Sequence, residues 1–94
     1  LQLNQPQIEQ IVRLQIKGVQ RMLKDSGVNL HLSGMAIDFL ATAGYDPEYG
    51  ARPVKRAIQR YLLNDLSKKL LSMAVDRSKP ILVERDNQGL VFRN

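Results

Sequence analysis

The sequence contains no cysteine and no tryptophan, and His31 is its single histidine. Without thiols the chain can form neither a disulfide framework nor a thiolate nucleophile, and one histidine without cysteine argues against a zinc site. No apolar run approaches the ~18 residues of a membrane span, and no signal-peptide pattern is present. We therefore expect a cytoplasmic domain with no bound metal and no contact with a membrane.

Recognisable catalytic motifs are also missing. A phosphate-binding P-loop needs the pattern G-x-x-x-x-G-K-[ST], whereas Gly44 and Gly50 have five residues between them and are followed by Ala51. No serine lies in a nucleophile context with a partner histidine. Asp46 and Glu48 are closely spaced, but they belong to a proline-containing segment, which favours a turn over an acid–base pair. We expect no catalysis from this chain alone.

What is present is the composition of an ordinary globular protein, with 44% hydrophobic and 24% charged residues over 94 positions. This length is typical of one domain with a thin core, so we predict a single domain over residues 1–94. Because the chain starts at Leu1 without an initiating methionine, we expect it to be part of a longer protein.

Hydrophobic spacing predicts an α+β fold, with about four helices packed with a small three-stranded sheet. We expect a helix that starts at Pro6, is capped by Asn4 or Gln5, and stops at Gly27. The other expected elements are a strand at 28–32, a helix over 34–43, a helix from Pro53, and a hairpin of 81–85 and 90–93 whose turn uses Gly89.

The net charge of +5 is concentrated in one segment. Residues 52–69 carry six basic residues and one acidic residue, whereas residues 1–51 carry four and five, and residues 70–94 carry four and three. The six basic residues are Arg52, Lys55, Arg56, Arg60, Lys68 and Lys69. Such an excess indicates an anionic partner, although a run of charge also arises on any solvated helix face.

Arg52 begins this basic segment and lies directly before Pro53. Proline suits the first helical turn and pushes the preceding residue out of the helical conformation, so we expect Arg52 at the helix cap. A cation there opposes the helix dipole unless an external anion meets it, and a guanidinium offers forked donors to phosphate oxygens. The small residues Gly50 and Ala51 would let a ligand approach closely. A surface ion pair with Glu48 explains Arg52 equally well.

The run GYDPEYGARPVKRAIQ at residues 44–59 resembles the signature in the C-terminal small domain of the Clp-type AAA+ ATPases. IVRLQIKGVQRML at residues 11–23, VNLHL at residues 28–32 and the expected hairpin fall in the family's order. The resemblance therefore covers nearly the whole chain. It is closest to the second ATPase module of the ClpB-type disaggregases, and the ClpA- and ClpC-type unfoldases come next.

The resemblance implies that Arg52 is the family's sensor 2 arginine, which contacts the γ-phosphate of ATP bound to the preceding large domain of the same subunit. Gly50 and Ala51 would shape the approach to the nucleotide, and Ile16 on the first helix would border the adenine. The implied cofactor is Mg-ATP, held mainly by the upstream large domain. That large domain and the neighbouring subunits of a hexameric ring would be the partners, and unfolded or aggregated proteins would be the substrates.

The chain departs from the family's pattern at two places. Family members often carry Asn-Pro where this chain has Asn64 and Asp65, and a glycine-bearing turn where it has Ser72-Met73-Ala74. We expect Asn64 and Asp65 to bend the long helix or to cap a new one that ends near Ala74. Both departures lie away from the expected nucleotide.

Two other classes of function stay open. The basic helix over residues 52–69 could bind nucleic acid, but aromatic residues are few and no recognition signature is present, so we expect no nucleic-acid partner. The chain could also be a structural adaptor in which Arg52 contacts only protein.

Overall fold

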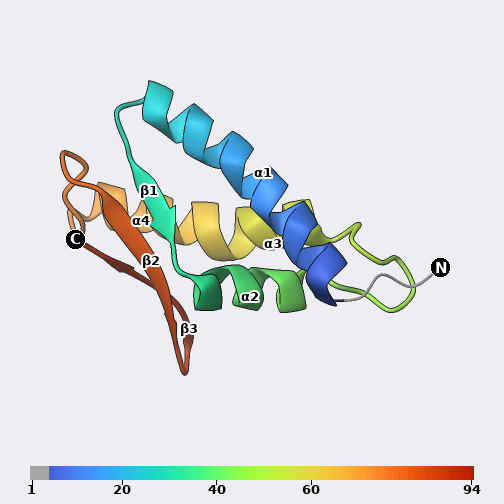
Figure 1. Ribbon diagram of the computed structural model, residues 1–94. Coiled ribbons are helices and arrows are strands. Elements are labelled where there is room, and N and C mark those ends of the chain that lie inside the picture. The colour runs from blue at the N-terminus through green and yellow to red at the C-terminus, as the bar shows by residue number, and fades with distance from the viewer. Residues whose placement is uncertain (1–4) are drawn as a thin grey trace.

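The computed structural model describes residues 5–94, with side chains from residue 6 onward. In chain order the elements are α1 (Gln5–Asp25), β1 (Leu30–Leu32), α2 (Gly34–Ala43), α3 (Val54–Ala57), the π-helical segment η1 (Ile58–Leu63), α4 (Asn64–Leu71), β2 (Ile81–Asp86) and β3 (Gly89–Arg93) (Figure 1). Because α3, η1 and α4 run on without a break, the described chain has three helices and not the expected four or so. The α+β class and the three-stranded sheet are confirmed.

The sheet is mixed and has the strand order β1–β2–β3. β1 runs parallel to β2, with Leu30 opposite Ile81, and β2 runs antiparallel to β3. The hairpin turn forms where it was expected, and Gly89 takes a φ of 134° there, which glycine adopts without steric cost. The strand expected at 28–32 is limited to Leu30–Leu32, and its His31 is exposed as expected.

The end of α1 explains why the first strand is shorter than expected. Gly27 has a φ of 83°, and the N–H groups of Gly27 and Val28 each donate to a carbonyl of the last helical turn at 2.9 Å. This is a Schellman motif, which satisfies carbonyls left free at a helix end. Val28 therefore belongs to the helix cap. At the other end, the expected cap at Asn4 lies outside the described residues, and Gln5 is already helical.

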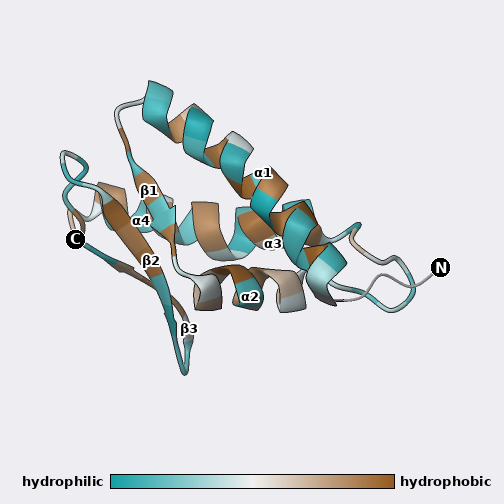
Figure 2. Ribbon diagram, in the orientation of Figure 1, coloured by the Kyte–Doolittle hydropathy of each residue, from teal (hydrophilic) through white to brown (hydrophobic). Residues whose placement is uncertain are grey.

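We call the unbroken run of α3, η1 and α4 the long helix. The core lies where α1, α2, the long helix and the sheet meet. Buried positions of α1 recur at spacings of four residues, and Figure 2 shows hydrophobic and hydrophilic residues alternating along that helix. Within residues 6–94 no polar or charged side chain is buried, so apolar burial is the main stabilising term. The largest fully buried side chains are Ile8, Leu40, Leu62, Leu66, Ile81, Val12, Val28, Val54 and Val83.

The long helix is irregular before Asn64 and not at it. The π-helical segment Ile58–Leu63 precedes Asn64, where the α-helix resumes. The side-chain amide of Gln59 donates to Asn64 Oδ1 at 3.2 Å, and this i to i+5 contact matches the wider π turn. The bend expected at Asn64 and Asp65 is thus replaced by a change of helix type one turn earlier.

α4 ends before Ala74, where its end was predicted, because the chain turns at Met73. The last helical residue is Leu71, and Met73 has a φ of 62°. The N–H of Met73 donates to Leu70 at 3.3 Å, and the N–H of Ala74 donates to Lys69 at 2.9 Å. This is a second Schellman motif, with methionine at the left-handed position that glycine usually occupies.

Candidate functional site

The loop between α2 and α3 is closed on itself by backbone hydrogen bonds. Asp46 and Gly50 form an antiparallel bridge, in which each N–H donates to the other's carbonyl, at 2.9 Å and 2.6 Å. Asp46 Oδ1 also accepts from the N–H groups of Glu48 at 2.7 Å and Tyr49 at 3.1 Å. Gly50 has a φ of 64°, which favours glycine. The turn expected from Asp46 is confirmed, and Arg52, two residues after Gly50, is exposed.

Gly44 holds the two ends of this loop together. A Cβ added at Gly44 would lie 2.9 Å from both Cα and Cγ2 of Val54, which is closer than packed carbon atoms tolerate. Only glycine therefore fits where the end of α2 meets the start of α3. The sequence predicted a helix that ends at residue 43, but not this close approach.

Arg52 lies directly before the N-cap residue of α3 and is not the cap itself. Pro53 is the N-cap, with φ −77° and ψ 0°, and α3 begins at Val54. A ψ of 0° differs from the −42° of a regular helix, so the helix starts one residue later than expected. The Arg52 N–H donates to the carbonyl of Tyr49 at 3.2 Å, and the Val54 N–H to that of Ala51 at 3.0 Å. Arg52 is thus held in a continuous set of turns.

The guanidinium of Arg52 contacts an aromatic ring and no carboxylate. Its Cζ lies 5.5 Å from the centroid of the Tyr49 ring, and the residue is exposed. Within residues 6–94 the two ion pairs are Arg13 with Glu9 and Arg93 with Glu84. The ion pair with Glu48 that was considered as an alternative does not form. The N–H donors of Arg52 are therefore available to an external anion.

A hollow of about 450 Å³ opens at Arg52. It is lined by Asp46, Tyr49, Arg52, Pro53 and Arg56. Arg56, four residues after Arg52, brings a second guanidinium to the same hollow. Neither Tyr49 nor Arg56 was predicted from the sequence to line a site with Arg52.

Of the remaining predicted site residues, two lie next to Arg52 and one lies in the core. Gly50 and Ala51 are half-buried and adjacent to Arg52, so these three form one turn, and Ala51 packs against the core. Ile16 is only 3% exposed and lies in the core. The Ile16 side chain is therefore not exposed at the surface, whereas Arg52 is.

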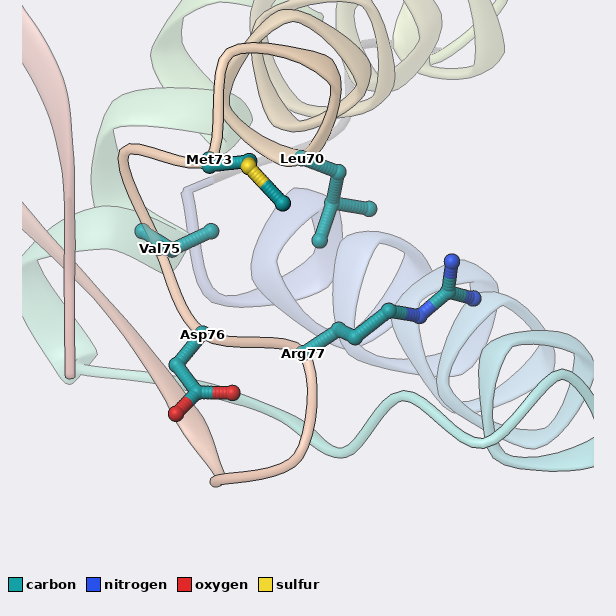
Figure 3. Close-up of a pocket in the computed structure, with 5 residues that line it drawn as sticks. All are labelled: Leu70, Met73, Val75, Asp76 and Arg77. Carbon is teal, nitrogen blue, oxygen red and sulfur yellow. The ribbon is translucent and has the colours of Figure 1, made fainter.

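A second hollow of about 270 Å³ lies at the far end of the long helix. It is lined by Leu70, Met73, Val75, Asp76 and Arg77, and the Asp76 carboxylate is directed away from Leu70 and Met73 (Figure 3). No nucleophile or cluster of charge of one sign lies there, so it carries no chemistry comparable with the hollow at Arg52.

Residues 6–94 contain neither a metal-binding cluster nor a membrane-spanning helix. No group of three or more His, Cys, Asp or Glu side chains is arranged to hold a metal ion. No helix in this part of the chain is long and apolar enough to cross a membrane.

Comparison with known proteins identifies the family. The family model described as the C-terminal, D2-small domain of ClpB protein matches residues 3–83. The chaperone protein ClpB of Bacteroides thetaiotaomicron is 66% identical over 94 residues, and that of Porphyromonas gingivalis is 48% identical over 92 residues. These matches cover 100% and 98% of this chain but 11% of each relative. The chain belongs to the family of C-terminal D2-small domains of ClpB protein.

Proposed function

We propose that the domain is the nucleotide-sensing lid of an ATP-dependent protein disaggregase, and that Arg52 is its sensor 2 residue. Arg52 contacts the γ-phosphate of ATP held by the large domain of the same subunit. The observation that carries this proposal is the exposed guanidinium, which rests on the Tyr49 ring beside an open hollow and has no carboxylate partner among residues 6–94.

The chemistry follows from the charge of the γ-phosphate. A charge-assisted hydrogen bond from Arg52 contributes roughly 1.5–3 kcal/mol, and it forms only while the γ-phosphate is present. Such a differential contact shifts the lid between two orientations and stabilises charge during phosphoryl transfer. Gly50 and Ala51 are small and keep the approach of the nucleotide to Arg52 open. Because Ile16 is buried, it influences a contact with the adenine only indirectly, by holding α1 in place. Catalytic groups lie in the large domain.

The wider setting is also part of the proposal. Mg-ATP is the cofactor, and the upstream large domain and neighbouring subunits of a hexameric, cytoplasmic ring are the partners. Unfolded or aggregated proteins are the substrates of the full-length protein. One observation weighs against the nucleic-acid alternative: the Tyr49 and Tyr61 rings each have an arginine over one face, which leaves less ring surface for stacking on bases.

ATP turnover by the full-length protein tests this function. Arg52→Ala should reduce turnover roughly ten- to a hundredfold, as expected from the loss of one charge-assisted contact. Arg13→Ala is the matched control, because Arg13 is an exposed arginine on α1 paired with Glu9. Equal turnover in Arg52→Ala and Arg13→Ala would show that Arg52 has no such role.

A further inference from the structure

A second basic surface adjoins the hollow at Arg52. It is a smaller hollow of about 110 Å³ where α2 faces the start of the long helix (Figure 1). Its lining residues are Ala43, Pro53, Arg56, Ala57, Arg60 and Tyr61, which we call the Arg56–Arg60 surface. Pro53 and Arg56 line both hollows, so the two lie side by side.

The Arg56–Arg60 surface combines an apolar floor with a cationic rim. Ala43, Pro53 and Ala57 present only carbon side chains, while Arg56 and Arg60 are exposed. Within residues 6–94 neither arginine forms an ion pair. Two neighbouring cations without counter-charge repel each other, so an external carboxylate or phosphate at this rim removes an unfavourable interaction as well as adding a favourable one.

Aromatic contacts hold one side of this surface in place. Arg60 Cζ lies 5.4 Å from the centroid of the Tyr61 ring. Tyr61 in turn packs edge-to-face on Phe39, with 5.4 Å between the centroids and 87° between the planes. The other cation on this pair is Arg85, 5.4 Å from the Phe39 centroid. A guanidinium whose face rests on a ring keeps its N–H edge free for an anion.

We propose that the Arg56–Arg60 surface binds an acidic polypeptide segment in which carboxylates flank one aliphatic side chain. The carboxylates pair with Arg56 and Arg60, and the aliphatic side chain enters the hollow between them. The hollow of about 110 Å³ is smaller than the enclosed apolar cavity of about 150 Å³ that accepts benzene, so it has room for no more than one small aliphatic side chain.

The segment is assigned to the remainder of the full-length chain. The chain spans 11% of the length of the two ClpB relatives compared above, so a full-length protein of that length offers many segments outside residues 1–94. A nucleic acid fits less well, because Arg60 already covers the Tyr61 ring that a base would stack on. The inference rests on the proposed function only in placing the domain within a larger protein.

Zero-length carbodiimide cross-linking of the full-length protein, without nucleotide, tests the proposal. This reagent joins an amine to a carboxylate only when the two are in contact, so Arg56→Lys and Arg60→Lys keep the charge and add reactive amines. Mass spectrometry should find these lysines joined to one Asp- or Glu-containing peptide from outside residues 1–94. Arg21→Lys on the exposed face of α1 is the matched control and should give no such product.

Removal of the second charge supplies the second measurement. Adding Arg60→Gln to Arg56→Lys should reduce the cross-link yield roughly tenfold, as the loss of a charged hydrogen bond predicts, whereas adding Arg21→Gln should leave it unchanged. A yield equal to that of Arg21→Lys, or a partner peptide without flanking carboxylates, would overturn the proposal. So would binding of single-stranded DNA that Arg56→Glu/Arg60→Glu weakens. Loss of turnover in Arg52→Ala without any cross-link would reject this surface and keep the proposed function.

Discussion

The guanidinium carbon of Arg52 lies 5.5 Å from the centroid of the Tyr49 ring, three residues earlier in the same closed loop. Such a cation–π contact contributes about 0.5–1 kcal/mol at an exposed site. It also limits the rotamers of a long side chain that would otherwise lose freedom on binding an anion. Tyr49 therefore serves to preorganise Arg52.

Removing the Tyr49 ring should weaken the action of Arg52 without abolishing it. Tyr49→Leu should reduce ATP turnover of the full-length protein about two- to fivefold, since about 0.5–1 kcal/mol of preorganisation is lost. Tyr49→Phe keeps the ring and is the matched control, with turnover near that of the unsubstituted protein. If Tyr49→Leu and Tyr49→Phe turn over ATP equally, the ring does not position Arg52.

Only part of the candidate site could be predicted from the sequence. The run Gly50-Ala51-Arg52 and its resemblance pointed to three residues that form one turn, and their contact with a nucleotide stays a prediction. Ile16 was predicted with them but lies in the core. The predicted start of α3 was one residue too early, because proline fixes φ but leaves ψ to its surroundings. The contact between Arg85 and Phe39 and the close approach at Gly44 depend on tertiary packing. No local pattern encodes them.

Gly44→Ala should destabilise the fold because its Cβ would lie 2.9 Å from the Val54 backbone. Overpacking of this kind costs typically about 1–3 kcal/mol, which urea unfolding followed by circular dichroism can measure. Gly18→Ala is the control, because nothing lies within 4 Å of the added Cβ. Within α1 that change should stabilise the helix by up to about 1 kcal/mol. Similar unfolding midpoints for the two variants would contradict the close packing of α2 on α3.

Met73→Gly should stabilise the domain. Met73 has a φ of 62°, and the left-handed conformation costs a non-glycine residue roughly 1 kcal/mol. Its side chain is 87% exposed, so little packing is lost with it. Leu71→Gly provides the contrast, because Leu71 is 86% exposed but helical, and glycine there should cost about 1 kcal/mol. The same urea experiment should show midpoint shifts of opposite sign. A lower midpoint for Met73→Gly would be inconsistent with strain at this turn.

Asp76 should titrate below its ordinary range in the folded state. Ser78 donates to Asp76 Oδ1 from its hydroxyl at 2.6 Å and from its N–H at 2.9 Å, and these bonds lower the pKa of Asp76 from 3.8. A lowered folded pKa means that the stabilising effect is complete above the unfolded value and is lost as the pH falls through the folded one. Ser78→Ala should raise the pKa of Asp76 in an NMR titration of its carboxyl carbon, whereas Ser67→Ala on α4 should not. An unchanged titration in Ser78→Ala would contradict this assignment.

The central claim is that Arg52 distinguishes ATP from ADP, and equilibrium binding of each nucleotide to the full-length protein tests it most directly. Arg52→Ala should weaken the binding of a non-hydrolysable ATP analogue roughly ten- to a hundredfold, because the γ-phosphate contact is lost. The affinity for ADP, which has no γ-phosphate, should stay within about twofold. Equal weakening of both nucleotides, or of neither, would contradict a γ-phosphate contact by Arg52.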